Sequence, residues 1–309
     1  MSKLLSLEVP SSLEGERLDR SLALLLGISR SQASKLIAEG SVHLKGKPLT
    51  APATRLTAGT TLRADAEAIE NLQPKLVGDP DVSVEIVHED TDLLVLEKAP
   101  NVVVHPGSGN LSGTLVAGLL ARFPEISEVG EVGRPGIVHR LDKGTSGLMV
   151  VARSNEAYGV LVEMFSRHVV VREYLAFCQG VPQNDKGTID APIGRSPRRP
   201  TEMTVVASGR EAITHYEVIQ RFANAALLKC QLETGRTHQI RVHLAAIGHS
   251  VLGDDVYSTA TTTATTPNSP PLTRPALHSS HLSLAHPITA QPLSFTSPLP
   301  PDLTQLLLA

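Results

Sequence analysis

The sequence places one carboxylate, Asp142, in a polar string that leads into an apolar run. The string HRLDK, residues 139–143, is followed by Gly147 and by the apolar residues 148–152. Such a short, partly β-branched run predicts a buried strand, and polar groups at the mouth of a strand can be held rigidly. Asp142 is therefore a candidate for nucleophilic or general-base chemistry. The structural alternative is a surface ion pair between Arg140 and Asp142, followed by a turn.

A second group of polar residues begins a predicted helix. Ile240, Leu244 and Ile247 recur at helical spacing, with Thr237 as the expected N-cap and Gly248 at the expected C-terminal end. The start of this helix carries three basic or titratable side chains, which are Arg236, His238 and Arg241. Because a helix N-terminus also presents free backbone N–H groups, the pattern predicts a site for a phosphate or a carboxylate.

We do not expect the histidines of this helix to bind a metal ion. His238 and His243 are five positions apart, which places them roughly 140° apart around a helix. They therefore cannot hold one ion from the same face, and no ligand set with metal spacing is present.

A third candidate is Tyr174, which follows Arg172 and Glu173 at the start of an expected strand over residues 174–179. An isolated tyrosine at such a position more often packs its ring on the core. Its occurrence together with the other two motifs makes it a candidate site residue.

The elements that position these groups fall into two parts. In residues 11–65, leucines at helical spacing predict one helix, Ser29 caps a second that ends at Gly40, and a hairpin turns at Lys45 and Gly46. Eight Lys and Arg against five Asp and Glu give this segment a net charge of +3, in a chain whose total is −3. Local basic charge of this kind favours nucleic-acid docking, although an ordinary solvated helical hairpin has the same composition.

The remainder of the chain predicts a second, larger domain. Residues 66–80 are acidic, contain two prolines and lack a clean period, so we expect a linker there. From residue 81 to residue 309, many short strands with intervening helices predict an α+β domain on a mixed or antiparallel sheet. Expected strands include residues 84–88, 93–98 and 102–105, with a helix over 115–122. Residues 258–275 form a Thr- and Pro-rich insert that we expect to be disordered.

Both parts resemble known families. The string HRLDKGTSGLMVVARS resembles the motif of the RluA-type pseudouridine synthases, and the chain is similar to the RluD-like branch over residues 13–302 apart from the insert. Residues 11–65 resemble the small α/β RNA-binding domain named after ribosomal small-subunit protein four. The resemblance implies a pseudouridine synthase fold with a mixed or antiparallel central sheet. It also implies isomerisation of specific uridines in structured RNA, above all large-subunit ribosomal RNA, with base flipping.

The resemblance also assigns roles to individual residues. Asp142 is the catalytic carboxylate, acting either as a nucleophile at the sugar or as a base on the ribose, and the sequence does not choose between them. Tyr174 contacts the flipped base, and Arg241, or alternatively Arg236, pairs with Asp142 and keeps it ionised. Substrate contacts are expected from Arg140, His139, Arg236, His238 and Lys143. RNA docking is expected from Arg17, Arg30, Lys35 and Lys45.

Composition limits the cofactors and the compartment. Uridine and pseudouridine are isomers, so we expect no metal, redox or nucleotide cofactor. The two cysteines exclude a disulfide framework, and the interrupted N-terminus and the lack of an 18-residue apolar run indicate neither signal peptide nor membrane span. We therefore expect a cytoplasmic protein, acting on RNA as a monomer.

Two other function classes compete with this one. A non-catalytic RNA-binding protein, acting in ribosome assembly or translation, would need only residues 11–65, but Asp142, Tyr174 and Arg241 together argue against it. A hydrolase could combine Asp142 with His139 or His105, yet the chain has neither a serine nucleophile elbow nor metal-ligand spacing.

Overall fold

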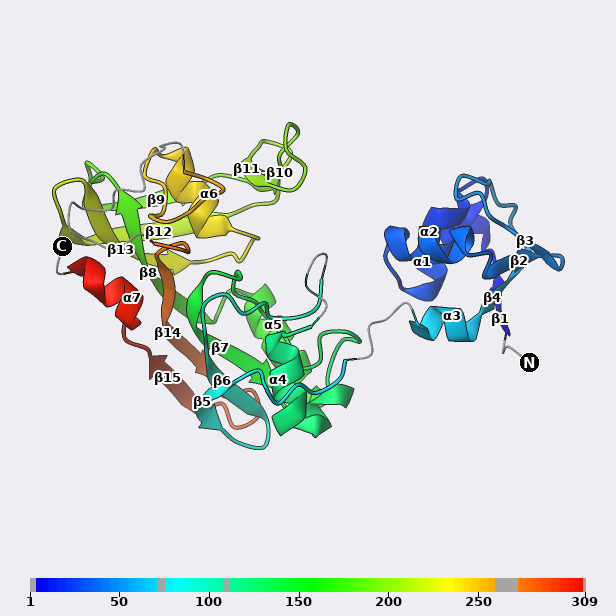
Figure 1. Ribbon diagram of the computed structural model, residues 1–309, viewed down its shortest axis with the longest axis horizontal. Coiled ribbons are helices and arrows are strands. Elements are labelled where there is room, and N and C mark those ends of the chain that lie inside the picture. The colour runs from blue at the N-terminus through cyan, green and yellow to red at the C-terminus, as the bar shows by residue number, and fades with distance from the viewer. Residues whose placement is uncertain (1–3, 72–75, 108–109, 111, 259–271, 308–309) are drawn as a thin grey trace. The chain divides into compact units, whose positions relative to one another are not determined.

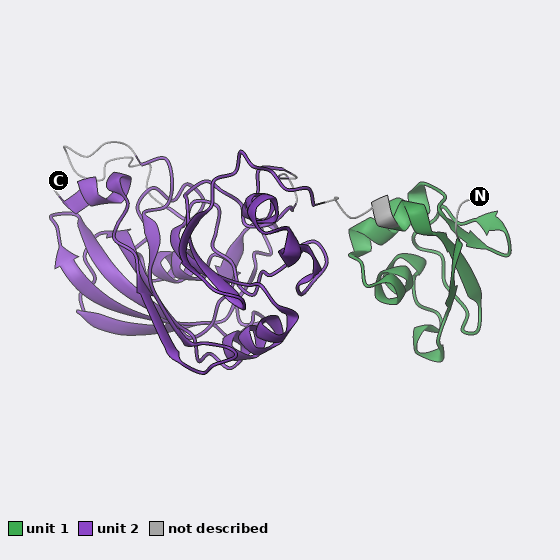
Figure 2. Cartoon of the chain, turned by 90° about the horizontal axis from the view of Figure 1, so that it is seen from below, with its two compact units in different colours: residues 1–75 green, residues 76–309 purple. Residues whose placement is uncertain are grey.

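The protein consists of two compact units, residues 1–75 and residues 76–309 (Figures 1 and 2). The computed structural model describes residues 4–71, 76–107, 110, 112–258 and 272–307. Each unit has its own buried apolar core. Within the described residues, no helix has the length and apolar character needed to span a membrane.

The N-terminal unit combines a four-stranded antiparallel sheet with two main helices. The strands, in spatial order, are β1 (Leu4–Glu8), β4 (Thr61–Asp65), β2 (Val42–Leu44) and β3 (Lys47–Pro48). A 3-10 turn (Ser11–Leu13) precedes helices α1 (Leu18–Leu26) and α2 (Arg30–Ala38). Their apolar faces bury Leu18, Leu22, Leu36 and Ile37 completely against the sheet residue Leu62.

Local chemistry explains how α2 and the hairpin begin and turn. The Ser29 hydroxyl accepts a hydrogen bond from the Gln32 backbone N–H, and the Gln32 side chain accepts one from the Ser29 backbone N–H. This reciprocal cap fixes the start of the helix. Lys45 and Gly46 have φ values of +49° and +77°, as a two-residue hairpin turn requires. The helix start at Ser29 and the hairpin turn lie where the sequence predicts them.

The expected linker over residues 66–80 is mostly structured. Residues Ala66–Asn71 form helix α3, in which Ala68 and Ile69 pack on the core of the N-terminal unit. Leu76 already packs on the core of the second unit, and the Asp79 backbone N–H donates to the Ala117 carbonyl. The acidic composition of residues 66–80 gives no indication of these apolar contacts. Residues 72–75 lie outside the described residues.

A nine-stranded mixed sheet forms the frame of the second unit. Eight strands follow the order β5-β6-β7-β14-β8-β13-β12-β9, and β15 pairs with β14. Their bounds are β5 Glu85–Glu89, β6 Leu93–Lys98, β7 Ser146–Ala152, β8 Val171–Gln179, β9 Lys186–Asp190, β12 Ile213–Arg221, β13 Ala225–Leu232, β14 Leu277–Ala285 and β15 Pro292–Thr296. The β7–β14 pair is parallel and the other pairs are antiparallel. The predicted α+β architecture with a mixed sheet is confirmed.

Helices cover this sheet at two places (Figure 1). Helices α4 (Leu115–Arg122) and α5 (Asn155–Ser166) lie beside the β5–β7 part, and α6 (Gln239–Ala246) contacts β12. A short separate hairpin pairs β10 (Ile193–Arg195) with β11 (Met203–Val205). The chain also forms a 3-10 turn at Pro124–Glu128, helix α7 at Pro301–Thr304 and a last turn at Gln305–Leu307.

The strand that follows the HRLD string is buried along its whole length. Every residue of β7 is buried, as the sequence predicts. Gly147 has a φ of +113°, and a side chain there would collide with the backbone of Ser279 on β14. Glycine is therefore required for the close β7–β14 pairing, which fixes the loop that carries Asp142.

Residues 102–105, expected as a strand, belong to no sheet: Val103 forms only an isolated bridge with Thr114, and residues 104 and 105 lie in a bend. The carbonyls of Val103 and Val104 accept hydrogen bonds from the backbone N–H groups of Leu115 and Val116. The backbone N–H groups at the start of α4 therefore bind the carbonyls that a neighbouring strand would otherwise bind. The local sequence pattern does not indicate this contact.

The expected insert over residues 258–275 falls mainly on residues 259–271, which lie outside the described residues. Its predicted end extends too far, because Arg274 is buried and forms two hydrogen bonds with the carboxylate of Asp302. This distant ion pair orders residues that the local composition assigns to the insert.

Candidate active site

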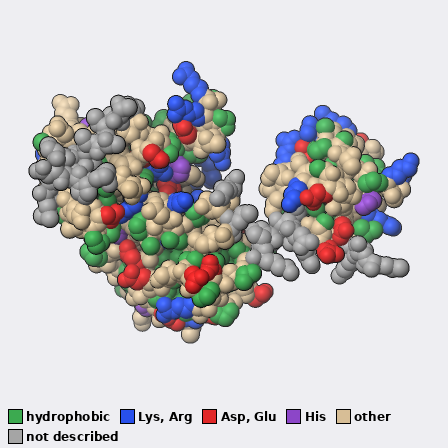
Figure 3. Space-filling model, viewed as in Figure 1, with side chains coloured by type: hydrophobic (Ala, Val, Ile, Leu, Met, Phe, Trp, Pro, Cys, Tyr) green, Lys and Arg blue, Asp and Glu red, His purple; other side chains and the backbone are tan. Residues whose placement is uncertain are grey.

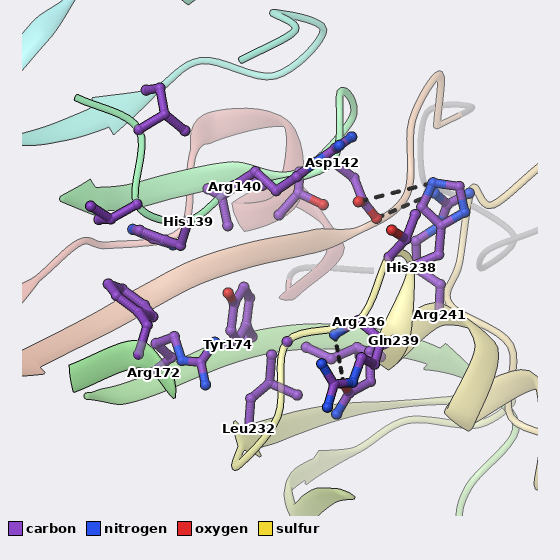
Figure 4. Close-up of a pocket in the computed structure, with 18 of the residues that line it drawn as sticks. His139, Arg140, Asp142, Arg172, Tyr174, Leu232, Arg236, His238, Gln239 and Arg241 are labelled. Atoms are coloured by element: carbon purple, nitrogen blue, oxygen red, sulfur yellow. Dashed lines mark hydrogen bonds and ion pairs between the residues drawn. The ribbon is translucent and has the colours of Figure 1, made fainter. Parts of the chain in front are cut away.

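A pocket of about 470 Å³ in the second unit brings the three sequence motifs together. Asp142 comes from the loop before β7, Tyr174 from β8 and Arg241 from α6 (Figure 4). Asp142 is the only carboxylate among the described residues that line this pocket, whereas several arginines line it. The pocket is therefore suited to an anionic ligand that reacts at a single carboxylate.

A buried lysine holds the loop that carries Asp142. Lys98 is fully buried, and its Nζ donates hydrogen bonds to the carbonyls of Ala99 (2.8 Å), Val102 (3.0 Å) and Lys143 (3.2 Å). Burial lowers the pKa of Lys98 to about 7. Because Lys98 ends β6 and binds the residue next to Asp142, it ties this loop to the sheet.

Arg241 is oriented toward Asp142 by a second carboxylate. Arg241 Nε and Nη2 donate to the two oxygens of Asp254 at 2.7 and 2.8 Å, and Nη1 lies 3.4 Å from Asp142 Oδ2. The Asp254 side chain is completely buried and Arg241 is 7% exposed. The two-point contact leaves the guanidinium little freedom, so one of its nitrogens is fixed beside Asp142.

Arg236 points elsewhere. Its Nε donates to the Glu211 carbonyl at 2.8 Å, although the residue lines the same pocket. Of the two arginines that the sequence leaves open as partners of Asp142, the structure places Arg241 against the carboxylate.

His238 lies near the other oxygen of the Asp142 carboxylate. Its Nε2 is 3.9 Å from Asp142 Oδ1, and its Nδ1 shares a 2.7 Å hydrogen bond with the Tyr257 hydroxyl. Burial lowers the pKa of His238. His238 itself, with a φ of +58°, is the N-cap residue of α6. The predicted cap at Thr237 is wrong, because this left-handed turn delays the helix by one residue.

Tyr174 and Arg172 occupy another part of the pocket. Tyr174 is 6% exposed, and burial raises the pKa of its phenol. Arg172 is also 6% exposed, and its guanidinium lies over the Phe165 ring at 5.4 Å. In the view of Figure 4, Tyr174 lies between Asp142 and Arg172.

The other predicted substrate contacts differ in position. His139 lines the pocket, but its Nε2 accepts a hydrogen bond from the Val150 backbone N–H and its ring stacks on Phe165. Burial and the nearby Arg172 lower the pKa of His139 to about 3, so it is uncharged and supports β7. Arg140 is exposed and lines the pocket, whereas the exposed Lys143 does not line it. The chain turns at Lys143, where the Thr145 N–H binds the Asp142 carbonyl.

Comparison with known proteins identifies the family of this chain. The model of the RNA pseudouridylate synthase family matches residues 92–246, and that of the S4 domain matches residues 16–62. The chain belongs to the RNA pseudouridylate synthase family.

Individual relatives agree over almost the whole length of this synthase. It is 43% identical over 307 residues to ribosomal large subunit pseudouridine synthase D of Nitrosomonas europaea, a match that covers 99% of this chain and 87% of the relative. The same-named protein of Zymomonas mobilis is 42% identical over 94% of this chain and 93% of its own. Among solved structures, human RNA pseudouridylate synthase domain containing 4 matches with a TM-score of 0.58 and 27% identity, over 72% of this chain and 91% of the human chain. The predicted resemblance is confirmed, and the protein is an RNA pseudouridine synthase, an isomerase.

Sequence reasoning missed three residues that shape the synthase pocket. These are Lys98, Arg172 and Asp254. In the sequence, Arg172 stands out only as a neighbour of Tyr174, and no local pattern marks Asp254. Lys98 alone has a local signal in the sequence, because a charged residue is unusual in a strand that is expected to be buried.

The predicted docking residues of the S4 domain are partly engaged within the protein. Arg17 and Arg30 both bind the carboxylate of Asp19, whose side chain is 4% exposed. The hydrogen bonds from Arg17 contribute most to lowering the pKa of Asp19 to about 2. Lys35 and Lys45 are exposed, and Figure 3 shows Lys and Arg side chains gathered on the surface of this unit.

One set of possible metal ligands occurs in the described part of the synthase, away from the pocket. It consists of Asp90, Asp92 and His286. The His286 Nδ1 accepts hydrogen bonds from the backbone N–H groups of Ile288 and Thr289. Its Nε2 therefore carries the proton and donates a hydrogen bond to Asp90 Oδ2 at 3.3 Å. This proton occupies the direction in which a metal would bind, so the set is suited to hydrogen bonding.

Proposed function

We propose that this synthase isomerises specific uridines of large-subunit ribosomal RNA, with Asp142 as the catalytic carboxylate and the target base flipped into the pocket. The observation that carries the proposal is Asp142 itself, the one carboxylate among the described pocket residues, 3.4 Å from an arginine held by Asp254. The RNA class follows from the relatives named ribosomal large subunit pseudouridine synthase D. We further propose that the enzyme acts in the cytoplasm as a monomer and without a metal ion.

The pocket residues have different proposed roles around one flipped nucleotide. Flipping a base out of its stack costs a few kcal/mol, which contacts to the pocket must offset. Tyr174 offers an aromatic face to the uracil, and the exposed Arg140 can contact the RNA at the pocket mouth. Arg241, 3.4 Å from the Asp142 carboxylate, holds it directed at the ribose, where Asp142 acts as nucleophile or as base.

The proposed function is tested by mapping pseudouridines in ribosomal RNA from a strain that lacks this gene. We expect one or more large-subunit positions to revert to uridine, to be restored by the wild-type gene and to stay unmodified with Asp142→Asn. An unchanged pseudouridine map would contradict the ribosomal target. Restoration by Asp142→Asn would contradict the role of this carboxylate and favour a non-catalytic RNA-binding role.

We also propose that the S4 domain docks on RNA and takes no part in the chemistry. Deleting residues 1–75 should weaken binding to structured ribosomal RNA and flatten its salt dependence, because Lys and Arg contacts to phosphates are lost. The slope of log affinity against log salt should fall by about one for each lost contact. The remaining unit has its own core and should still modify a short stem-loop slowly.

A milder variant serves as a control for this deletion. Lys35 and Lys45 are exposed, so Lys35→Ala with Lys45→Ala should leave the fold intact and reduce the same slope by up to about two. Equal slopes for the full-length, deleted and doubly substituted proteins would mean that these residues form only a solvated face.

A further inference from the structure

Arg172 is a buried cation without an acidic partner. It is 6% exposed, and its Nη2 donates one hydrogen bond, to the Glu233 carbonyl at 3.0 Å. Its Nε is buried and has no hydrogen-bond partner among the described residues. No carboxylate of the described residues forms an ion pair with it. Arg172 also lines the pocket beside Tyr174.

A buried arginine without an acidic partner is unfavourable for the stability of the fold. Burying an unpaired charge is costly, and burial accordingly lowers the pKa of Arg172. The other buried arginines of this unit are neutralised, Arg241 by Asp254 and Arg274 by Asp302. A cation that is left unpaired in a binding pocket is suited to a negative charge that appears only when substrate is bound or reacts.

Two parts of an RNA substrate could present negative charge to Arg172, which are a backbone phosphate and the uracil ring once its bond to the ribose breaks. Phosphates carry a full, hydrated charge and suit the exposed arginines that line the pocket, which are Arg134, Arg140 and Arg210. Arg172 is instead buried beside Tyr174, on which the proposed function places the uracil. Its environment therefore favours the uracil ring.

The reaction creates a negative charge on that ring by either route open to Asp142. The bond between ribose carbon 1′ and uracil nitrogen 1 breaks, and its electron pair leaves with the uracil as an anion spread over nitrogen 1 and the two carbonyl oxygens. Carbon 1′ is then either bonded to Asp142 or part of a double bond, after Asp142 has removed the carbon 2′ proton. Carbon 5 next attacks carbon 1′, Asp142 is released or returns its proton, carbon 5 loses its proton and nitrogen 1 gains one.

We propose that Arg172 is a further catalytic residue, which contacts the departing uracil and stabilises its negative charge while the glycosidic bond is broken. The inference rests on the proposed pseudouridine synthase reaction and on the Asp142 and Tyr174 positions. A desolvated donor aimed at a developing anion is worth about 10²–10³ in rate. Arg172 has free donors for this contact because the protein uses one of its nitrogens for the Glu233 carbonyl.

The test compares variants in single turnover, with enzyme in saturating excess over a ribosomal RNA fragment that contains a mapped target uridine. Release of tritium from carbon 5 reports the completed reaction. Arg172→Met should lower the single-turnover rate about 10²–10³-fold, with a much smaller change in RNA affinity. Arg172→Lys, which keeps the charge but loses the planar donors, should lie between Met and wild type.

A better leaving group separates the catalytic role from a structural one. Fluorine at carbon 5 withdraws electrons and stabilises the uracil anion, so the enzyme should depend less on Arg172. With 5-fluorouridine at the target position, loss of the original nucleoside reports bond breakage. We expect Arg172→Met to slow this step about tenfold or less, compared with the 10²–10³-fold loss on uridine.

Two further variants keep the test decisive if Arg172→Met folds poorly. A Cβ at Gly235 would lie 2.8 Å from Arg172 Nη1, so Gly235→Ala should displace the guanidinium without changing charge and lower the rate about tenfold or more. Arg153 is the matched control, because it also stacks on a phenylalanine and has a buried Nε without a partner, but it pairs with Glu89 and Glu125. Arg153→Met should lower thermal stability and leave the single-turnover rate unchanged.

The outcomes separate this inference from the function on which it rests. If wild-type protein forms no pseudouridine, the proposed function is wrong. If wild type is active and Arg172→Met, Arg172→Lys and Gly235→Ala keep its single-turnover rate, only the role of Arg172 is wrong. Equal losses on uridine and 5-fluorouridine would show a merely structural role. A weaker affinity with an unchanged chemical rate would show a phosphate contact.

Discussion

Replacing Asp142 with asparagine should abolish pseudouridine formation and leave RNA binding in place. Asparagine keeps the shape of the side chain and removes the charge needed at the ribose. A group that only shuttles a proton contributes about 10²–10⁴ in rate, and we expect a larger loss because either proposed route begins with this carboxylate. Tritium release from carbon 5 of the target uridine measures the rate, and filter binding measures affinity.

The variant should fold normally, which makes its activity interpretable. The Asp142 side chain is 17% exposed, and Arg241 keeps both of its hydrogen bonds to Asp254 when Asp142 is neutral. The buried Arg241 guanidinium therefore keeps its compensating carboxylate. A folded Asp142→Asn protein that forms pseudouridine at a substantial rate would refute the assignment.

The features that the sequence predicted depend on short-range patterns. The buried strand after HRLD follows from a run of apolar residues, and the start of α2 follows from Ser29 and Gln32, three positions apart. The pocket motifs could be found because each string resembles a motif of the family at several polar residues. Local patterns of this kind do not depend on the tertiary fold, and they therefore survive in a single sequence.

The features that the sequence did not predict depend on distant partners. Arg17 and Arg30 looked like free RNA contacts, yet both bind the buried Asp19. Arg172 lacks an acidic partner because of the residues that surround it in the fold. An exposed arginine in a strand would have the same local sequence pattern. Arg274 looked like part of the insert because its partner, Asp302, lies in another segment.

The Arg241–Asp254 pair should show that stability and activity can be separated at this site. Arg241→Met leaves the fully buried Asp254 carboxylate without its cation. Losing one partner of a buried ion pair costs about 3–5 kcal/mol of unfolding free energy. The same change removes the group that positions Asp142, so the single-turnover rate should also fall about 10²-fold or more.

A second substitution should restore the stability and not the rate. In Arg241→Met with Asp254→Asn, the buried pair is neutral, and the amide oxygen of the new side chain can still accept the hydrogen bonds that Asp254 Oδ1 receives from the Val256 and Tyr257 backbone N–H groups. Urea unfolding should therefore recover most of the lost free energy, because no unpaired charge stays buried. The rate, measured well below the unfolding midpoint, should stay at the level of Arg241→Met. A double variant that regains both stability and activity would mean that Arg241 serves only to neutralise Asp254, and that Asp142 needs no arginine to hold it.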